Sequence, residues 1–317
     1  MLINRAVVPI GSVGAYKAGH GNATGHHGEI IQGAMRNQDR IIHRFLVTLP
    51  CNELYTQARF EPSLQLAGHI IVPDDKAKSR MAIEITLKYL NRSDFGGQLH
   101  LRSNIEKGFG MGSSTTDVVA TIRAVADAFG RPLLPEIVAH LAVAAETASD
   151  AIMFEDNCVM FAQRRGVVLE YLGSGLPPLH VLSINTARDA PLDTVATPAA
   201  RYSDWELQSF CALSGMIRRA IRTGDPYLLG RVATASATIS QRHIPKPAFE
   251  EIQVIARAND ACGVQVSHSG TVVGLLFNAF CPNLNVMVES ASKDLSSIGM
   301  APDFRFSTLH RRHEYAS

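Results

Sequence analysis

The chain has 317 residues, of which 46% are hydrophobic and 19% charged, a composition typical of globular rather than disordered proteins. Lys and Arg number 30 against 29 Asp and Glu, so the formal net charge is +1, which argues against nucleic acid or an anionic membrane as partner. The chain has no apolar run of about 18 residues, no uninterrupted signal-like core and five scattered cysteines without a CxxC pair, so we expect a cytoplasmic protein.

The hydrophobic pattern predicts helices and strands in a mixed order. In chain order we expect a strand over 40–50, a helix over 76–91, a strand and loop over 96–108, helices over 114–130 and 134–146, strands over 166–173 and 179–186, helices over 205–222, 226–240 and 247–259, strands over 264–267 and 272–277, a helix over 283–296 and a strand near 304–309. This order lacks the strict alternation of a doubly wound sheet, so the predicted fold class is α+β. A division near residue 175 gives an N-terminal half, 1–175, and a C-terminal half, 176–317.

The segment Lys107–Asp117, KGFGMGSSTTD, opens the clearest helix pattern of the chain. Its three glycines allow a close backbone approach to an anion, and the helix start offers free amides and a positive dipole end to a phosphate. The motif is neither a Walker A loop nor a dinucleotide fingerprint. Ser114 and Asp117 also resemble a capping box, and the alternative is a turn that only caps the helix.

The segment GHHGEIIQG, residues 25–33, places two adjacent histidines and a carboxylate between glycines. Adjacent residues rarely bind one metal ion together, so His26 and His27 are poor joint ligands. Glu29 either contacts a substrate or nucleotide, or it is a solvated carboxylate in a turn. We therefore keep this segment as a candidate ligand contact.

Two further segments carry polar side chains near apolar runs. In ETASDAIMFEDN, Glu146 and Asp150 are four residues apart at a helix end, where the carboxylates can face one cleft or remain solvated. In GVQVSHSGTVVGLLF, the turn SHSG separates two apolar runs. A hydrolase with Ser269 as nucleophile beside His268 is disfavoured, because GxSxG is absent and neighbouring strand residues point to opposite faces. A polar turn lining a site is the better interpretation.

Taken together and in their order along the chain, the segments resemble the GHMP small-molecule kinases, in the branch that contains the L-threonine kinases. KGFGMGSSTTD is similar to the phosphate loop of that family, although Met111 and Gly112 replace a Leu-Gly pair and a preceding proline is missing. GHHGEIIQG, SQRHIPKP and SHSGTVVG are similar to further motifs of the branch. The resemblance extends from residue 23 to about 277.

The resemblance implies a two-domain fold, with an N-terminal half like domain 2 of ribosomal protein S5 and a ferredoxin-like C-terminal half. It implies ATP and Mg²⁺ as cofactors, with Ser114 and Glu146 as metal ligands. Asp150, together with Ser114, is the nearest match to the catalytic residues, although the family spaces its two acids further apart. The phosphate-binding residues would be Lys107, Gly108, Gly110, Met111, Gly112, Ser113, Ser114 and Thr115.

The implied reaction is phosphorylation of the side-chain hydroxyl of a small amino acid, L-threonine first, giving O-phospho-L-threonine and ADP. Arg242 and Lys246 are the cations to test for its α-carboxylate. The alternatives are a kinase for homoserine, serine or a modified hydroxy amino acid, and a catalytically silent nucleotide-binding regulator. The oligomeric state stays open, a homodimer included. Implied substrate contacts are Glu29, His27, Arg242, His268, Ser269 and Gly270.

Overall fold

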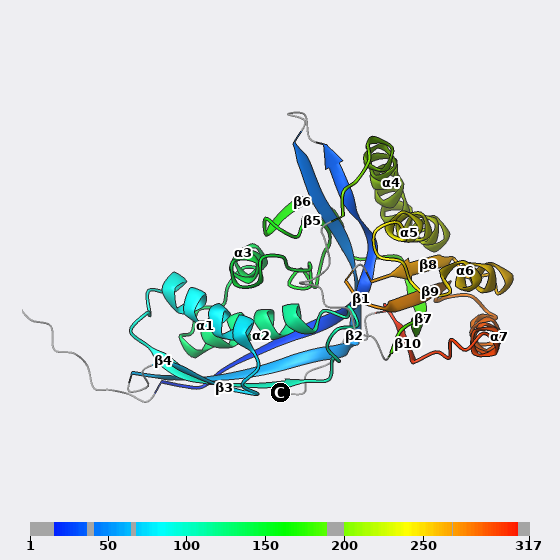
Figure 1. Ribbon diagram of the computed structural model, residues 1–317. Coiled ribbons are helices and arrows are strands. Elements are labelled where there is room, and N and C mark those ends of the chain that lie inside the picture. Colours follow the sequence, from blue (N-terminus) through cyan, green and yellow to red (C-terminus); the bar gives the residue numbers. More distant parts are fainter. Residues whose placement is uncertain (1–15, 37–40, 65–67, 189–199, 268, 310–317) are drawn as a thin grey trace, which may run out of the picture.

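A computed structural model describes residues 16–36, 41–64, 68–188, 200–267 and 269–309 (Figure 1). The strands are β1 (Gly19–Arg36), β2 (Ile42–Ser63), β3 (His69–Val72), β4 (Gly96–Ser103), β5 (Cys158–Ala162), β6 (Val167–Gly173), β7 (Leu179–Asn185), β8 (Gly263–Val266), β9 (Val272–Asn278) and β10 (Phe304–Ser307). The helices are α1 (Ala77–Tyr89), α2 (Ser113–Ala128), α3 (Pro135–Glu146), α4 (Asp204–Thr223), α5 (Pro226–Ser240), α6 (Phe249–Ala258) and α7 (Leu284–Ser297).

One sheet runs through both halves of the chain, with strand order β10-β7-β9-β8-β1-β2-β4-β3 and with β5 and β6 attached to β2. Its centre is the long antiparallel pair β1 and β2, which crosses the molecule (Figure 1). The register of β1 shifts between Thr24 and Gly25, between His26 and Glu29, and between Glu29 and Ile31. Such bulges bend a strand and re-aim its side chains. Glu29 lies at this bend and pairs with β8 as well as with β2.

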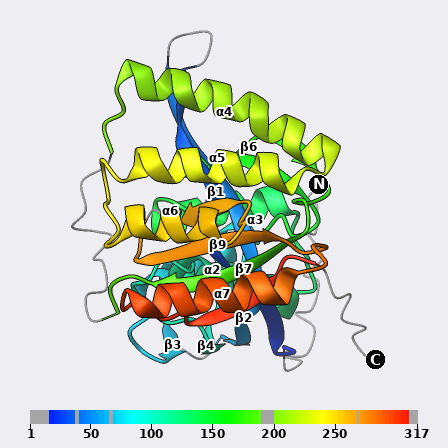
Figure 2. The same cartoon turned by 90° about the vertical axis from the view of Figure 1, so that its right-hand side faces the viewer.

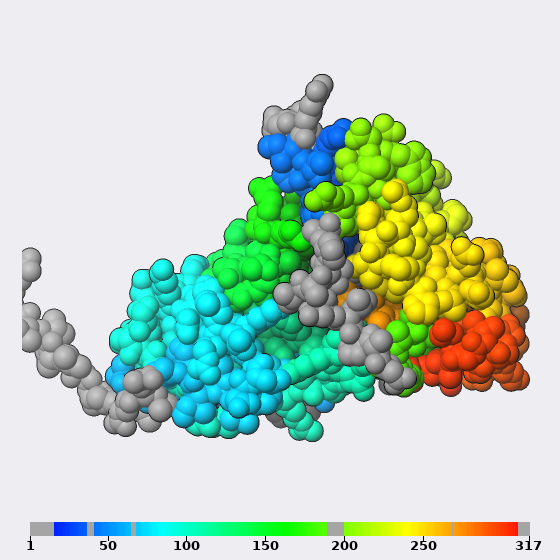
Figure 3. All heavy atoms as spheres, in the orientation of Figure 1, coloured from blue at the N-terminus to red at the C-terminus, as the bar shows by residue number. Residues whose placement is uncertain are grey.

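Helices cover the sheet in two groups. In Figure 1, α1, α2 and α3 lie over the N-terminal part of the sheet, and α2 packs along β1. Most residues of α2 are buried because it is covered from both sides, by the sheet and by α1 and α3. Figure 2 shows α4, α5, α6 and α7 in successive rows on the outer face of the C-terminal part. The two parts therefore lie side by side, joined through β1 and β8 (Figure 3).

The predicted α+β class is confirmed, and the predicted helices and strands are present to within a few residues, except that the strand predicted over 40–50 extends to Ser63 as β2. The sequence missed β1, β3 and β5. In particular, the segment 25–33 is not a turn but the middle of β1, so the interpretation of Glu29 as a solvated turn carboxylate is wrong. Its side chain is buried. The sheet is continuous across residue 175, and the division there stays a prediction.

Within the described residues, each helix is too short or too polar to cross a membrane.

Candidate active site

The glycine-rich segment forms a loop that leads directly into α2. Gly108, Gly110 and Gly112 all have positive φ angles, of 87°, 81° and 79°, which are unfavourable for other residues. Gly112 is the N-cap of α2, and no side chain caps the helix. A helix start without a capping side chain is a ready site for an anion, because its first amides lack partners within the helix.

The predicted capping box is therefore wrong. Ser114 Oγ donates to Glu146 Oε2 at 2.9 Å instead of accepting from the helix backbone. Asp117 is buried and pairs with the ammonium of Lys76, and it accepts a hydrogen bond from Thr56 Oγ1 at 3.0 Å. The helix begins at Ser113 with Gly112 as its N-cap, so Ser114 lies inside the first turn and Asp117 beyond it, and neither is at a capping position.

The turn between β8 and β9 supports the glycine loop. The Thr271 amide donates to the Phe109 carbonyl at 3.1 Å, and a Cβ on Gly270 would lie only 2.0 Å from that same oxygen. The predicted contact of this turn with the site thus arises partly through its packing against the loop. Ser269 is exposed beside it, and His268 lies outside the described residues.

Two hydrogen-bonded pairs, each with one carboxylate, lie at the start of α2. Ser114 and Glu146 form the first of these carboxylate pairs. Lys78 Nζ donates to Ser114 Oγ at 3.0 Å and lies 3.9 Å from Glu146 Oε2. Burial and the charge of Asp150 raise the pKa of Glu146 to about 7. Its other oxygen, Oε1, is buried and has no hydrogen-bond partner among the described residues. A hydroxyl beside a half-satisfied buried carboxylate is a donor set that fits Mg²⁺, which prefers oxygen ligands.

Asp150 forms the second pair, with His26. Asp150 Oδ2 accepts from His26 Nε2 at 2.9 Å and from Thr115 Oγ1 at 3.2 Å. Burial tends to raise the pKa of Asp150, but the charge and hydrogen bond of His26, with the bond from Thr115, lower it overall. The neighbours Ser114 and Thr115 thus each bind one of the two acids. This convergence was predicted only in outline, from the spacing of Glu146 and Asp150.

His26 is fixed on every side. The Gly28 amide donates to Nδ1 at 3.0 Å, which requires a lone pair there and places the proton on Nε2, toward Asp150. Burial lowers the pKa of His26, but Asp150 and Glu29 raise it, to about 9. The charged ring carries a proton on Nδ1 as well, so charging His26 costs the hydrogen bond from Gly28. His26, Glu29 and Asp150 have ligand atoms within 4.8 Å of one another, but both ring nitrogens of His26 are already hydrogen-bonded, so the ring holds Asp150 rather than an ion.

His27, the predicted substrate contact, lies elsewhere. Its Nδ1 is 2.9 Å from Gln265 Oε1 and its Nε2 is 2.8 Å from Ser183 Oγ, on β8 and β7. It is fully buried, and this lowers its pKa to about 4. The ring also packs against Phe304 and Phe306. The structure therefore places His27, neutral and with both nitrogens bonded, in the packing of the sheet.

The two candidate cations of the segment 240–247 are also separated. Arg242 has a side chain that is 62% exposed and pairs with Glu206 at 3.0 Å. Lys246 is only 5% exposed, and its Nζ has no hydrogen-bond partner among the described residues. The charge of Glu29 acts on it. Of the two, Lys246 is thus the buried one, and it follows α5, which packs on β1.

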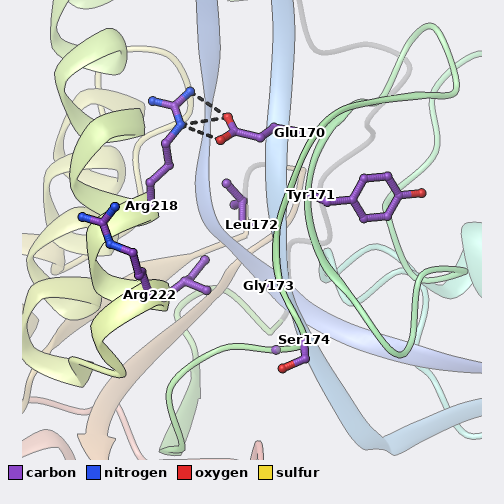
Figure 4. A pocket seen from close by; sticks show the side chains of 9 residues that line it. Glu170, Tyr171, Leu172, Gly173, Ser174, Arg218 and Arg222 are labelled. Atoms are coloured by element: carbon purple, nitrogen blue, oxygen red, sulfur yellow. Dashed lines mark hydrogen bonds and ion pairs between the residues drawn. The ribbon is translucent and has the colours of Figure 1, made fainter.

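A concave region outside this site lies between β6 and α4 (Figure 4). Its lining includes Arg218 and Arg222, one helical turn apart, and Glu170. Both oxygens of Glu170 accept from Arg218 Nε at 2.8 Å, so these charges already satisfy each other. None of its lining residues belongs to the glycine loop or to the two carboxylate pairs.

Comparison with known proteins gives this geometry a family. The profile of the GHMP kinase N-terminal domain matches residues 78–155, and that of the GHMP kinase C-terminal domain matches residues 217–292. Both domains of the GHMP kinases are thus recognised in this chain. Both matches occur in the expected order, and the first includes the glycine loop, Glu146 and Asp150.

Relatives of known name agree with this assignment. An L-threonine kinase of Citrobacter freundii is 28% identical over 273 residues, which cover 79% of this chain and 83% of that enzyme. An L-threonine kinase of Salmonella typhimurium is 28% identical over 193 residues, 57% of this chain and 60% of that enzyme. The crystal structure of homoserine kinase from Cytophaga hutchinsonii superposes with a TM-score of 0.66 at 15% identity, over 95% of this chain and 96% of that one. The predicted GHMP kinase fold is thereby confirmed.

Proposed function

We propose that the protein transfers the γ-phosphoryl group of ATP to the side-chain hydroxyl of a small amino acid, L-threonine first. The observation that carries the proposal is the convergence at the start of α2, where Ser114 binds Glu146 and the next residue, Thr115, binds Asp150. A glycine loop for phosphates, a metal-type carboxylate and a second, ionised carboxylate are the parts that phosphoryl transfer to an alcohol needs. The L-threonine kinase relatives support the choice of acceptor.

The binding roles follow from the contacts. The triphosphate would lie on residues 107–115, against the uncapped start of α2. Ser114 and Glu146 would hold Mg²⁺, which supplies charge neutralisation at the phosphates. Lys78, which sequence analysis missed because no motif surrounds it, adds a positive charge beside both of these side chains.

In the transfer step the acceptor hydroxyl oxygen forms a bond to the γ-phosphorus while the bond from that phosphorus to the bridging oxygen of ADP breaks. The hydroxyl proton passes to Asp150. His26 and Thr115 keep this carboxylate ionised and oriented, and its lowered pKa makes it a weak base. A weak base suffices because the transition state of phosphoryl transfer is loose and the proton leaves late.

The test is ADP release from Mg-ATP, coupled to NADH oxidation, across L-threonine, D-threonine, L-serine, L-homoserine and a blank without acceptor. We expect turnover with L-threonine that is absent from the blank and from Glu146→Gln, a variant of matched shape. Turnover with L-serine or L-homoserine alone would instead assign that acceptor. Rates equal to the blank in every reaction, with ATP still raising the melting temperature, would overturn the kinase and support the nucleotide-binding regulator.

A further inference from the structure

Lys246 is a buried cation that the described residues leave without a hydrogen-bond partner. Lysine is almost never fully buried unless it is paired, because its charge loses hydration that no protein contact replaces. Burial lowers the pKa of Lys246 to about 8, against the opposing effect of Glu29, so the ammonium form still dominates at neutral pH. A buried ammonium group whose Nζ has no acceptor among the described residues is a group that an anion from outside the chain can complete.

The position of Lys246 is rigid. Its backbone amide donates to Gln241 Oε1 at 2.7 Å, just after the end of α5, and prolines precede and follow it in the sequence. Proline fixes φ and restricts the residue before it, so the backbone here has little freedom. The ammonium group is therefore presented by a preorganised segment and not by a loose surface side chain.

Glu29 connects Lys246 with the proposed transfer site. The Glu29 carboxylate, which acts on Lys246, lies 3.9 Å from His26 Nδ1. The other nitrogen of His26 binds Asp150, the proposed acceptor of the hydroxyl proton. The ligand atoms of Glu29, His26 and Asp150 all lie within 4.8 Å of one another. The helix that precedes Lys246, α5, packs on β1 close to Glu29, where the Gln32 amide donates to Ser236 Oγ at 3.1 Å.

We infer that Lys246 binds the α-carboxylate of the amino acid acceptor. The inference rests on the proposed function and specifies how the acceptor is recognised. A carboxylate supplies both the hydrogen-bond acceptor and the negative charge that Lys246 lacks. The charge of Glu29 favours the protonated form of Lys246, against the effect of burial on its pKa. Arg242, the other candidate, is excluded from this role by its exposure and its pairing with Glu206.

The experiment compares L-threonine with (R)-1-aminopropan-2-ol, which has the same hydroxyl and amine but no carboxylate. The wild-type protein should prefer L-threonine by about 10²-fold or more in kcat/KM, the size expected for a buried charged contact. In Lys246→Met this preference should fall to within about 3-fold of unity, through loss of L-threonine activity, with the KM for ATP unchanged. A residue with only a structural role would lower both rates together.

Two matched variants control this result. Lys293→Met removes an exposed lysine of α7 and should keep the wild-type preference. Lys246→Met should melt at the wild-type temperature or above, because it removes an unpartnered buried charge. The inference is overturned if Lys246→Met keeps the wild-type preference, or if Arg242→Met is the variant that loses it.

The experiment distinguishes a failure of this inference from a failure of the proposed function. If the wild-type protein phosphorylates L-threonine and (R)-1-aminopropan-2-ol equally well, the kinase stands and the role of Lys246 is refuted. If no acceptor is phosphorylated, calorimetric binding of the two compounds in the presence of ADP decides the role of Lys246. A preference for L-threonine that Lys246→Met abolishes supports it, whereas a preference that persists, or no binding at all, overturns it.

Discussion

At Gly112, we expect one added methyl group to impair the function of the glycine loop. A Cβ on Gly112 would lie 2.3 Å from His26 Cδ2 and 2.5 Å from His26 Nε2, far inside van der Waals contact. The ring cannot yield easily, because it is buried and hydrogen-bonded to Gly28 and Asp150. Relief of the overlap requires a displacement of about 1 Å, enough to lose the 2.9 Å bond between His26 and Asp150.

The magnitude follows from two effects in Gly112→Ala. The φ angle of 79° costs an alanine about 1 kcal/mol of stability. Misplacement of a site residue by about 1 Å costs about 10²-fold in rate. Gly299→Ala is the matched control, because its φ of 78° carries the same backbone cost while nothing lies within 4 Å of its Cβ.

The assay pairs urea unfolding with kcat/KM for the best acceptor. We expect both variants to lose about 1 kcal/mol of unfolding free energy through the backbone, with any further loss confined to Gly112→Ala. Only Gly112→Ala should lose about 10²-fold in kcat/KM. If its activity stays within about 3-fold of Gly299→Ala, the contact between the loop and His26 does not position Asp150, and the reasoning is refuted.

Three further predictions concern the two carboxylate pairs. Asp150→Asn should lower kcat by at least about 10²-fold if Asp150 accepts the proton, whereas a loss of a few fold in a folded protein would remove it from that role. Ser114→Ala should raise the Mg²⁺ concentration needed for half-maximal rate, and an unchanged titration would contradict its role as a ligand. The folded-state pKa of His26, raised to about 9, stabilises the protein fully below its unfolded value near 6.5, and this stabilisation is lost as the pH rises through 9. Urea unfolding between pH 6 and 10 should show this decline in the wild-type protein and a weaker one in His26→Gln; equal slopes would show that Gly28 keeps the ring neutral.

The sequence by itself determined the elements and the local chemistry of the glycine loop. Helix periods, turn residues and the run of glycines followed by hydroxyls act within one or two turns, so they can be read without the fold. The spacing of Glu146 and Asp150 likewise predicted two acids near one cleft. The local pattern failed at the start of α2, where Gly112 and not Ser114 is the N-cap. Ser114 and Asp117 bind Glu146 and Lys76 instead, which the sequence did not indicate.

Two pairs of candidates are near neighbours in the sequence, His26 with His27 and Arg242 with Lys246. Only the tertiary structure decided how each of these side chains is oriented. His26 faces Asp150 and His27 faces Gln265, 124 and 238 residues away, because β1 passes through the sheet there with bulges that no composition pattern reveals. Lys246 is buried and Arg242 exposed although they are near neighbours in one segment, since packing of the C-terminal helices against β1 fixes which side chain turns inward. The residue types were visible in the chain, but their orientation depends on contacts between distant segments that form only when it folds.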